Sequence, residues 1–200
     1  MFKKKALTMK FFLALVVIIA TSIICFAGCT QKNSTNVNTQ TLASTSFFDL
    51  SAQTIDGKTV SMNEYKGKYI LVINTASKCG YTSQYKDLEK LYQQYKDRLV
   101  ILGFPSNDFL WQEPGSNEKI KTFCEVNYKI TFPMFAKISV KGKDKHPLYE
   151  WLTDPKLNGW NSTKPGWNFN KYLIDKEGKL IAHFGSKVEP LSQEITSLLK

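Results

Sequence analysis

Cysteine and histidine, the usual ligands of a zinc site, are few in this chain. Of its 200 residues, four are cysteine and two are histidine, and His146 and His183 stand isolated. No spacing among these residues fits the ligand pattern of a metal site. A second thiol is also missing beside Cys79, because Thr82 occupies the position that would complete a Cys-x-x-Cys pair. The absences predict a protein without a metal centre or other cofactor, and they disfavour a dithiol oxidoreductase.

Residues 1–28 have the order of a secretory signal rather than of a folded domain. A basic stretch precedes an almost wholly apolar run, residues 11–27, and small residues lead to Cys29. This end resembles a bacterial lipoprotein signal, in which the cysteine is lipidated and becomes the mature N-terminus, although Phe26 stands where Leu is usual. The alternative is an uncleaved transmembrane anchor, since the run approaches the roughly 17 residues that a span needs. Both interpretations place the rest of the chain outside the cytoplasm, anchored to the bacterial cell membrane.

Residues 29–46 are rich in Gln, Asn, Ser and Thr and contain few apolar residues. Such a composition cannot bury enough surface to fold, so a flexible tether is expected here. The sequence shows no second linker and no internal repeat. Residues 47–200 therefore have the length of one domain with a full core.

The positive charge lacks the pattern of a nucleic-acid-binding surface. The formal net charge is +10, and removal of the four lysines of the signal leaves 23 Lys and Arg against 17 Asp and Glu, or +6. These charges are scattered lysines rather than an arginine-rich stripe with interleaved aromatic residues. We expect no nucleic acid partner, and at most a mild attraction to anionic lipid headgroups.

Short apolar runs alternate with amphipathic segments along the domain. Strands are expected at 47–50, 59–62, 69–74, 99–104, 135–140, 171–174 and 180–184. Helices are expected at 83–97, from Ser116 onward, at 146–152 and at 190–199. Asp56-Gly57 and the turn at 176–178 mark two hairpins. This order predicts an α/β domain with a mixed central sheet flanked by helices and an N-terminal β-hairpin.

Cys79 lies where the strand at 69–74 gives way to a helix. A thiol at a helix N-terminus faces unpaired backbone N–H groups and the positive end of the helix dipole, and both stabilise a thiolate. The position therefore favours a single reactive nucleophile. The alternative is a small buried hydrophobic residue, which is the usual role of a free cysteine.

Two polar clusters accompany the thiol, at 103–115 directly after a strand and at 167–175 leading into one. Loops at the carboxyl ends of parallel strands gather in one place, so these segments can converge on Cys79. The amides of Gln112 and Asn168 and the indole N–H of Trp167 are neutral donors, which would stabilise a thiolate without adding a titrating group. Taken singly, each of these residues is more typical of a turn or a core.

Together these motifs resemble the glutathione peroxidase family. Residues 74–82 are similar to the family's peroxidatic signature, Gln112 falls on its catalytic Gln before Glu-Pro-Gly, and Trp167 and Asn168 fall on its Trp-Asn pair. The resemblance runs from about Phe47 to the C-terminus. It implies a thioredoxin fold and a catalytic tetrad of Cys79, Gln112, Trp167 and Asn168.

The chain departs from the family pattern in three places. Ser106 stands where many members have a cysteine, and Asp108-Phe109-Leu110 replaces the usual Gln-Phe-Gly. The chain is also short between Leu152 and Trp167, where tetrameric members carry a subunit-contact insertion. The last departure suggests a monomer.

Cys124 looks like the resolving cysteine of family members recycled by thioredoxin. Two cysteines borne on helices rarely come within the roughly 4.4–6.8 Å between Cα atoms that a disulfide needs, so we expect the helix around Cys124 to unwind locally during turnover. The resemblance implies a peroxidase acting on hydrogen peroxide or organic hydroperoxides. It favours a thioredoxin-like reductant over glutathione. A buried core cysteine is the alternative for Cys124, and a thiol-disulfide oxidoreductase or redox sensor is the alternative for the whole domain.

Overall fold

The computed structural model describes residues 46–200. The signal sequence, Cys29 and the tether, apart from Ser46, lie outside the described residues. Within residues 46–200, no helix has both the length and the apolar character needed to span a membrane.

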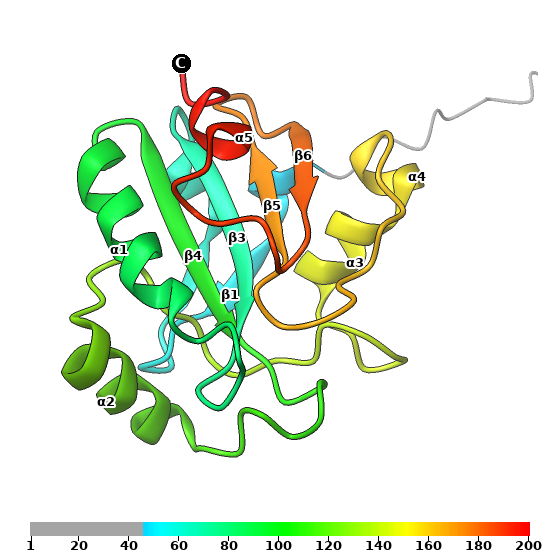
Figure 1. Cartoon of the computed structure of the whole chain (residues 1–200). Coiled ribbons are helices and arrows are strands. Elements are labelled where there is room, and N and C mark those ends of the chain that lie inside the picture. The colour runs from blue at the N-terminus through cyan, green and yellow to red at the C-terminus, as the bar shows by residue number, and fades with distance from the viewer. Residues whose placement is uncertain (1–45) are drawn as a thin grey trace, which may run out of the picture. The chain divides into compact units, whose positions relative to one another are not determined.

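A mixed four-stranded sheet forms the centre of the domain (Figure 1). Its strands are β3 (Tyr69–Thr75), β4 (Leu99–Pro105), β5 (Lys171–Ile174) and β6 (Leu180–Phe184), in the spatial order β4-β3-β5-β6. Strands β3 and β4 are parallel, whereas β5 is antiparallel to both β3 and β6. The carboxyl end of β3 therefore lies beside the carboxyl end of β4 and the amino end of β5.

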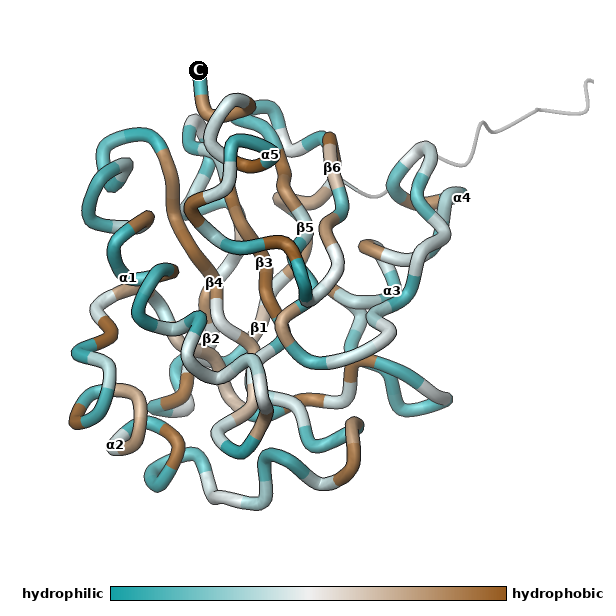
Figure 2. The backbone as a smooth tube through the Cα atoms, in the orientation of Figure 1, coloured by the Kyte–Doolittle hydropathy of each residue, from teal (hydrophilic) through white to brown (hydrophobic). Residues whose placement is uncertain are grey.

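Both faces of the sheet are buried, and the side chains of each strand alternate between two cores. Ile70 and Val72 contribute to one core, and Leu71 and Ile73 contribute to the other. The continuous apolar run of β3 follows from this double burial, and Figure 2 shows the hydrophobic character of the central strands.

Helices and short elements cover the two faces separately (Figure 1). The face of Leu71 is covered by α1 (Gln84–Tyr95), α2 (Asn117–Tyr128) and α5 (Gln193–Thr196). The opposite face is covered by the 3₁₀ helices η1 (Phe47–Asp49) and η2 (Met62–Tyr65), the hairpin of β1 (Ser51–Gln53) and β2 (Thr59–Ser61), α3 (Pro147–Thr153) and α4 (Pro155–Asn158). The α/β class, the mixed sheet and the N-terminal hairpin are confirmed.

Three predicted elements were wrong. Residues 47–50 begin with a 3₁₀ helix because Ser46 and Asp49 form a capping box around it. Residues 135–140 form no regular strand, since their N–H groups are divided between two strands instead of following one ladder. Phe135 and Ile138 donate to Gly103 O and Pro105 O of β4, whereas Ala136 donates to Gln53 O of β1. The C-terminal helix is confined to Gln193–Thr196, with Ser192 at its N-cap.

Candidate active site

Asn74, at the end of β3, ties the segment around Trp167 to the sheet. Its side chain donates to Trp167 O (3.0 Å) and accepts from the N–H of Asn170 (3.1 Å), and its own carbonyl accepts from the N–H of Phe169 (2.6 Å). Asn74 is fully buried. The sequence predicted the convergence of these loops but not this residue's part in it. A polar residue ending an apolar strand was the available signal.

Cys79 lies in a series of turns before α1, not in the first turn of the helix. The hydroxyl of Thr82 accepts the Cys79 N–H (3.0 Å) and donates to Ala76 O (2.8 Å), which closes the turn. The N–H of Tyr81 points at Cys79 Sγ at 3.4 Å. The expected backbone donor is thus present, but it comes from this turn rather than from the end of α1. The thiol is 8% exposed, so its environment is largely dry.

Gln112 and Asn168 meet in the structure. Asn168 Nδ2 donates to Gln112 Oε1 (3.0 Å), and the N–H of Lys78, beside Cys79, donates to Gln112 O (3.0 Å). Trp167 adjoins Asn168 and packs on Phe109, with 5.7 Å between ring centroids. The three loops therefore converge. Within residues 46–200, Cys79 Sγ accepts a hydrogen bond from the Tyr81 N–H and none from Gln112, Trp167 or Asn168.

Phe169, next to Asn168, has a left-handed backbone with φ of 64°, which is unusual for an aromatic residue. The ammonium group of Lys171 donates to Phe169 O (2.9 Å) and so helps to hold this turn. Lys171 is fully buried in the structure, and burial lowers its pKa to about 8. Ser186 supports the same segment by donating to Asn168 O (2.6 Å). Neither Lys171 nor Ser186 was singled out from the sequence.

Glu113 places a carboxyl group directly behind Gln112. The carboxyl is buried, and its Oε2 accepts from the hydroxyl of Ser77 (3.0 Å). Burial raises the pKa of Glu113, because desolvation outweighs the hydrogen bonds from Ser77 and the attraction of Lys137. The hydrogen bond links the loop before Cys79 to the loop after β4.

The comparisons with known proteins agree with this geometry. A family model described as glutathione peroxidase matches residues 47–153. A glutathione peroxidase of Lactococcus lactis is 51% identical over 156 residues, which cover 76% of this chain and 99% of the relative. The chain belongs to the glutathione peroxidase family. It is accordingly a peroxidase, an oxidoreductase.

Two further comparisons bear on the chemistry and the fold. The glutathione peroxidase-like peroxiredoxin 2 of Saccharomyces cerevisiae is 48% identical over 160 residues, covering 78% of this chain and 98% of the relative. The solved thioredoxin domain of a thiol-disulfide oxidoreductase from Bacteroides vulgatus superposes with a TM-score of 0.53 at 19% identity, covering 78% of this chain and 97% of that chain. The second likeness confirms the thioredoxin fold expected from the resemblance to glutathione peroxidases.

The other cysteine of residues 46–200, Cys124, lies inside α2 and is 1% exposed. Cys79 and Cys124 are both free thiols. Burial raises the pKa of Cys124 to about 11, so its thiol stays protonated at neutral pH. The hydroxyl of Tyr85 lies near the Cys124 thiol but completes no hydrogen bond with it. Cys124 in this folded form is therefore a poor nucleophile.

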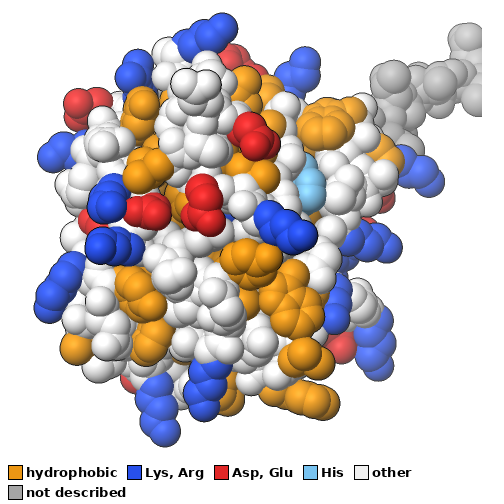
Figure 3. Space-filling view, in the orientation of Figure 1, with side chains coloured by type: hydrophobic (Ala, Val, Ile, Leu, Met, Phe, Trp, Pro, Cys, Tyr) orange, Lys and Arg blue, Asp and Glu red, His pale blue; other side chains and the backbone are white. Residues whose placement is uncertain are grey.

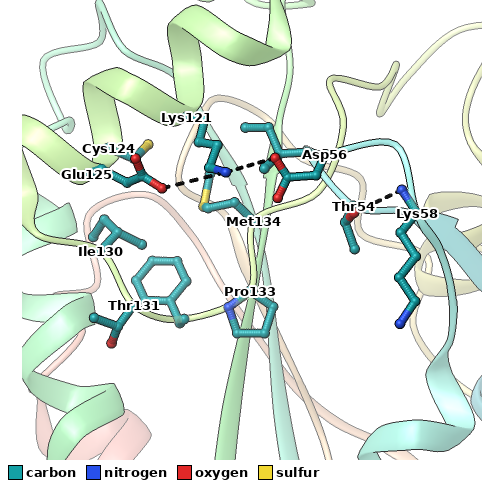
Figure 4. A pocket seen from close by; sticks show the side chains of 12 residues that line it. Thr54, Asp56, Lys58, Lys121, Cys124, Glu125, Ile130, Thr131, Pro133 and Met134 are labelled. Carbon is teal, nitrogen blue, oxygen red and sulfur yellow. Dashed lines mark hydrogen bonds and ion pairs between the residues drawn. The ribbon is translucent and has the colours of Figure 1, made fainter.

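Two pockets border α2 on different sides. Cys124 lines a pocket of about 440 Å³ between α2 and the β1–β2 hairpin, together with Asp56 and Lys121 (Figure 4). A separate pocket of about 370 Å³ lies between the loop before Cys79 and α2, and Ile120 and Phe123 line it on the helix side. Cys124 thus borders the pocket beside the hairpin, while its buried thiol lies near Tyr85 in the core, and it does not line the pocket beside the Cys79 loop.

Proposed function

We propose that this enzyme is a thiol peroxidase in which Cys79 is the nucleophile. The Cys79 thiolate attacks the distal oxygen of a hydroperoxide, the O–O bond breaks, and the sulfur keeps one oxygen as a sulfenic acid. The leaving alkoxide or hydroxide takes up a proton and departs as alcohol or water. The observation that carries this assignment is the convergence of three loops at Cys79, held by the hydrogen bonds from Lys78 to Gln112 and from Asn168 to Gln112.

The paired amides explain how the site would stabilise charge. Because Gln112 Oε1 already accepts from Asn168 Nδ2, the Nε2 group of Gln112 is left to donate to the thiolate or to the departing oxygen. The Tyr81 N–H, already aimed at the sulfur, supplies a second donor. The indole N–H of Trp167 would supply a third. Preorganised neutral donors of this kind stabilise developing negative charge without themselves titrating.

Recycling requires a second thiol, and we assign this role to Cys124. Its thiol condenses with the Cys79 sulfenic acid, forming a disulfide and releasing water, and an external dithiol then reduces the disulfide by exchange. A thioredoxin-like protein suits this step better than glutathione. Its two thiols reduce the Cys79–Cys124 disulfide and form a disulfide within the reductant, whereas glutathione would need two separate molecules. Similarity to a yeast protein named a peroxiredoxin supports a thiol-based cycle.

We also propose that the enzyme works outside the cytoplasm, attached to the bacterial cell membrane through lipid on Cys29. The proposal rests on the basic, apolar and small-residue order of residues 1–29.

Peroxide consumption by the purified protein with thioredoxin, thioredoxin reductase and NADPH tests the assignment. The wild type should turn over. The Cys124→Ser variant should reduce one equivalent of peroxide and then stop as a sulfenic acid, which over-oxidises in excess peroxide. By mass spectrometry, the wild type treated with one equivalent should instead hold a Cys79–Cys124 disulfide. Unchanged thioredoxin-dependent turnover of Cys124→Ser would show that Cys124 is only a core residue.

A further inference from the structure

Leu110 and Trp111, immediately before Gln112, form an exposed apolar tip. The two side chains are 69% and 77% exposed, the highest values among the large hydrophobic residues of the described domain. Figure 2 shows hydrophobic colouring at the tip of the loop between β4 and α2. Because the Leu and Trp side chains stay in water, they contribute no burial free energy to folding. Their exposure therefore needs another explanation.

The backbone conformation of the tip is also unfavourable for large side chains. Leu110 and Trp111 both have left-handed conformations, with φ of 51° and 53°. Glycine adopts this region without strain, and Leu110 stands where the family usually has glycine. The chain therefore displays a large apolar side chain from a backbone position at which that side chain is unfavourable.

The root of the tip is firmly held. The Asp108 carboxylate accepts from the N–H groups of Val140 (2.6 Å) and Lys141 (3.2 Å). Phe109 is buried and packs on Trp167. The Gln112 N–H donates to Phe109 O (3.2 Å) and closes the turn. The apolar tip is thus presented rigidly, and its base is in contact with a predicted catalytic residue.

Three lysines lie on segments that contact residues next to the tip. Lys141 Nζ lies 4.5 Å above the ring of Phe109, and Lys78 is exposed beside Gln112. Lys187, also exposed, lines with Trp167 a pocket of about 480 Å³. Figure 3 shows hydrophobic side chains gathered on the lower right of the view, with several Lys or Arg side chains and fewer Asp or Glu side chains near them. The Asp108 carboxylate at the root is occupied by hydrogen bonds from Ser139, Val140 and Lys141.

We propose that Leu110 and Trp111 insert into the interface of an anionic lipid bilayer, with Lys78, Lys141 and Lys187 facing the headgroups. Tryptophan and lysine are the residues that favour this interface. The proposal rests on the proposed function, since docking would turn the pocket beside Trp167 toward peroxidised acyl chains.

The length of chain outside the structure would allow the tip to reach a membrane. Residues 30–45 separate the proposed lipid on Cys29 from the domain. Whatever its conformation, such a stretch reaches at most about 55 Å, which exceeds the roughly 40 Å across a domain of this size. A domain attached in this way can therefore bring any of its faces to the membrane, including the one that carries the tip.

Co-sedimentation with vesicles tests the proposal on residues 46–200. The Lactococcus relative consists almost entirely of the matching segment, so we expect residues 46–200 to fold on their own. The domain should bind vesicles of phosphatidylglycerol and phosphatidylcholine in equal parts, and bind pure phosphatidylcholine more weakly. Leu110→Gly combined with Trp111→Asn should lower binding about tenfold or more, because both apolar anchors are lost. Gly and Asn both suit a left-handed backbone, so a loss of fold is not expected, and a thermal melt verifies this.

Val126→Ser is the matched control, since Val126 is 60% exposed but lies on α2. It should bind vesicles like the wild type. The Cys79→Ser variant should also bind normally, because docking needs no chemistry. This arm separates failure of the docking proposal from failure of the proposed function. Absence of wild-type binding, or equal binding by the double variant, would overturn the proposal. So would a double variant that keeps vesicle binding but has a raised KM for thioredoxin, since the tip would then serve a protein reductant.

Discussion

The N-cap of α2 offers a way to test whether this helix opens before Cys124 reacts. Ser116 is the N-cap, and its hydroxyl accepts from the N–H of Lys119 at 3.5 Å, near the limit for such a bond. Replacing an N-cap serine by alanine costs about 0.5–2 kcal/mol, and the long distance here points to the lower half, about 0.5–1 kcal/mol. If α2 opens as a local unit, Ser116→Ala should raise the open population about two- to fivefold.

The rate of disulfide formation should rise by the same factor. Cys124 is buried within α2, so in the proposed cycle we expect the Cys79 sulfenic acid to wait for α2 to open. The assay oxidises the reduced protein with one equivalent of peroxide, quenches with acid, alkylates the remaining thiols and follows the loss of free Cys124 by mass spectrometry. Hydrogen exchange of the α2 amides reports the opening independently.

Ser192→Ala is the matched control, because Ser192 is the N-cap of α5 but its hydroxyl makes no capping hydrogen bond. It should leave the rate unchanged. If Ser116→Ala speeds amide exchange in α2 while the rate of disulfide formation stays at the wild-type value, opening of α2 does not gate the reaction and the reasoning fails.

Three other predictions concern single residues. Cys79→Ser should abolish peroxide reduction and leave the circular dichroism spectrum intact; activity above a few per cent of wild type would remove Cys79 as nucleophile. A metabolically supplied fatty acid should label the wild type but not Cys29→Ser, and equal labelling would place the anchor elsewhere. For Lys171, the pKa of about 8 in the folded protein lies below the usual value. Between about pH 8 and 10.5 the unfolded state therefore binds more protons than the folded state, and the free energy of unfolding of the wild type increases as the pH rises. Lys171→Met should lose that gain, and its stability relative to wild type in urea titrations should be up to about 3 kcal/mol less favourable at pH 10 than at pH 7. An identical difference at both pH values would contradict the lowered pKa.

The fold followed from patterns that are local in the sequence. The apolar runs at β3 and β4 and the capped start of α2 at Ser116 were predicted within a residue or two, because burial on both faces and N-capping act over a few neighbours. Residues 135–140 were predicted wrongly for the opposite reason. Their apolar character is real, but their backbone partners are distant in the sequence and divided between β4 and β1, and no local pattern records this.

The candidate site divides in the same way. Gln112, Trp167 and Asn168 were found because they sit in long motifs, and the structure brings their loops together while their catalytic roles remain predictions. Asn74 and Lys171 were missed, since each acts by bonding backbone atoms of the segment around Phe169. Such bonds depend on the left-handed backbone of Phe169, a conformation that an aromatic residue rarely adopts and that the sequence therefore does not predict.

Thr82, at the position where a second cysteine would form a Cys-x-x-Cys pair, relates the turn around Cys79 to the opening expected of α2. Its hydroxyl accepts from Cys79 and donates to Ala76, and both bonds hold the turn that carries the nucleophile. A thiol at this position would be a weaker partner for both groups, so the residue that fixes the turn is also the one that excludes a neighbouring second cysteine. The partner thiol must then come from another element, and in this domain it is buried in α2. In the proposed cycle, Thr82 at this position therefore has two consequences. We expect the turn to hold Cys79 ready for peroxide, and the opening of α2 to set when the oxidised thiol is resolved.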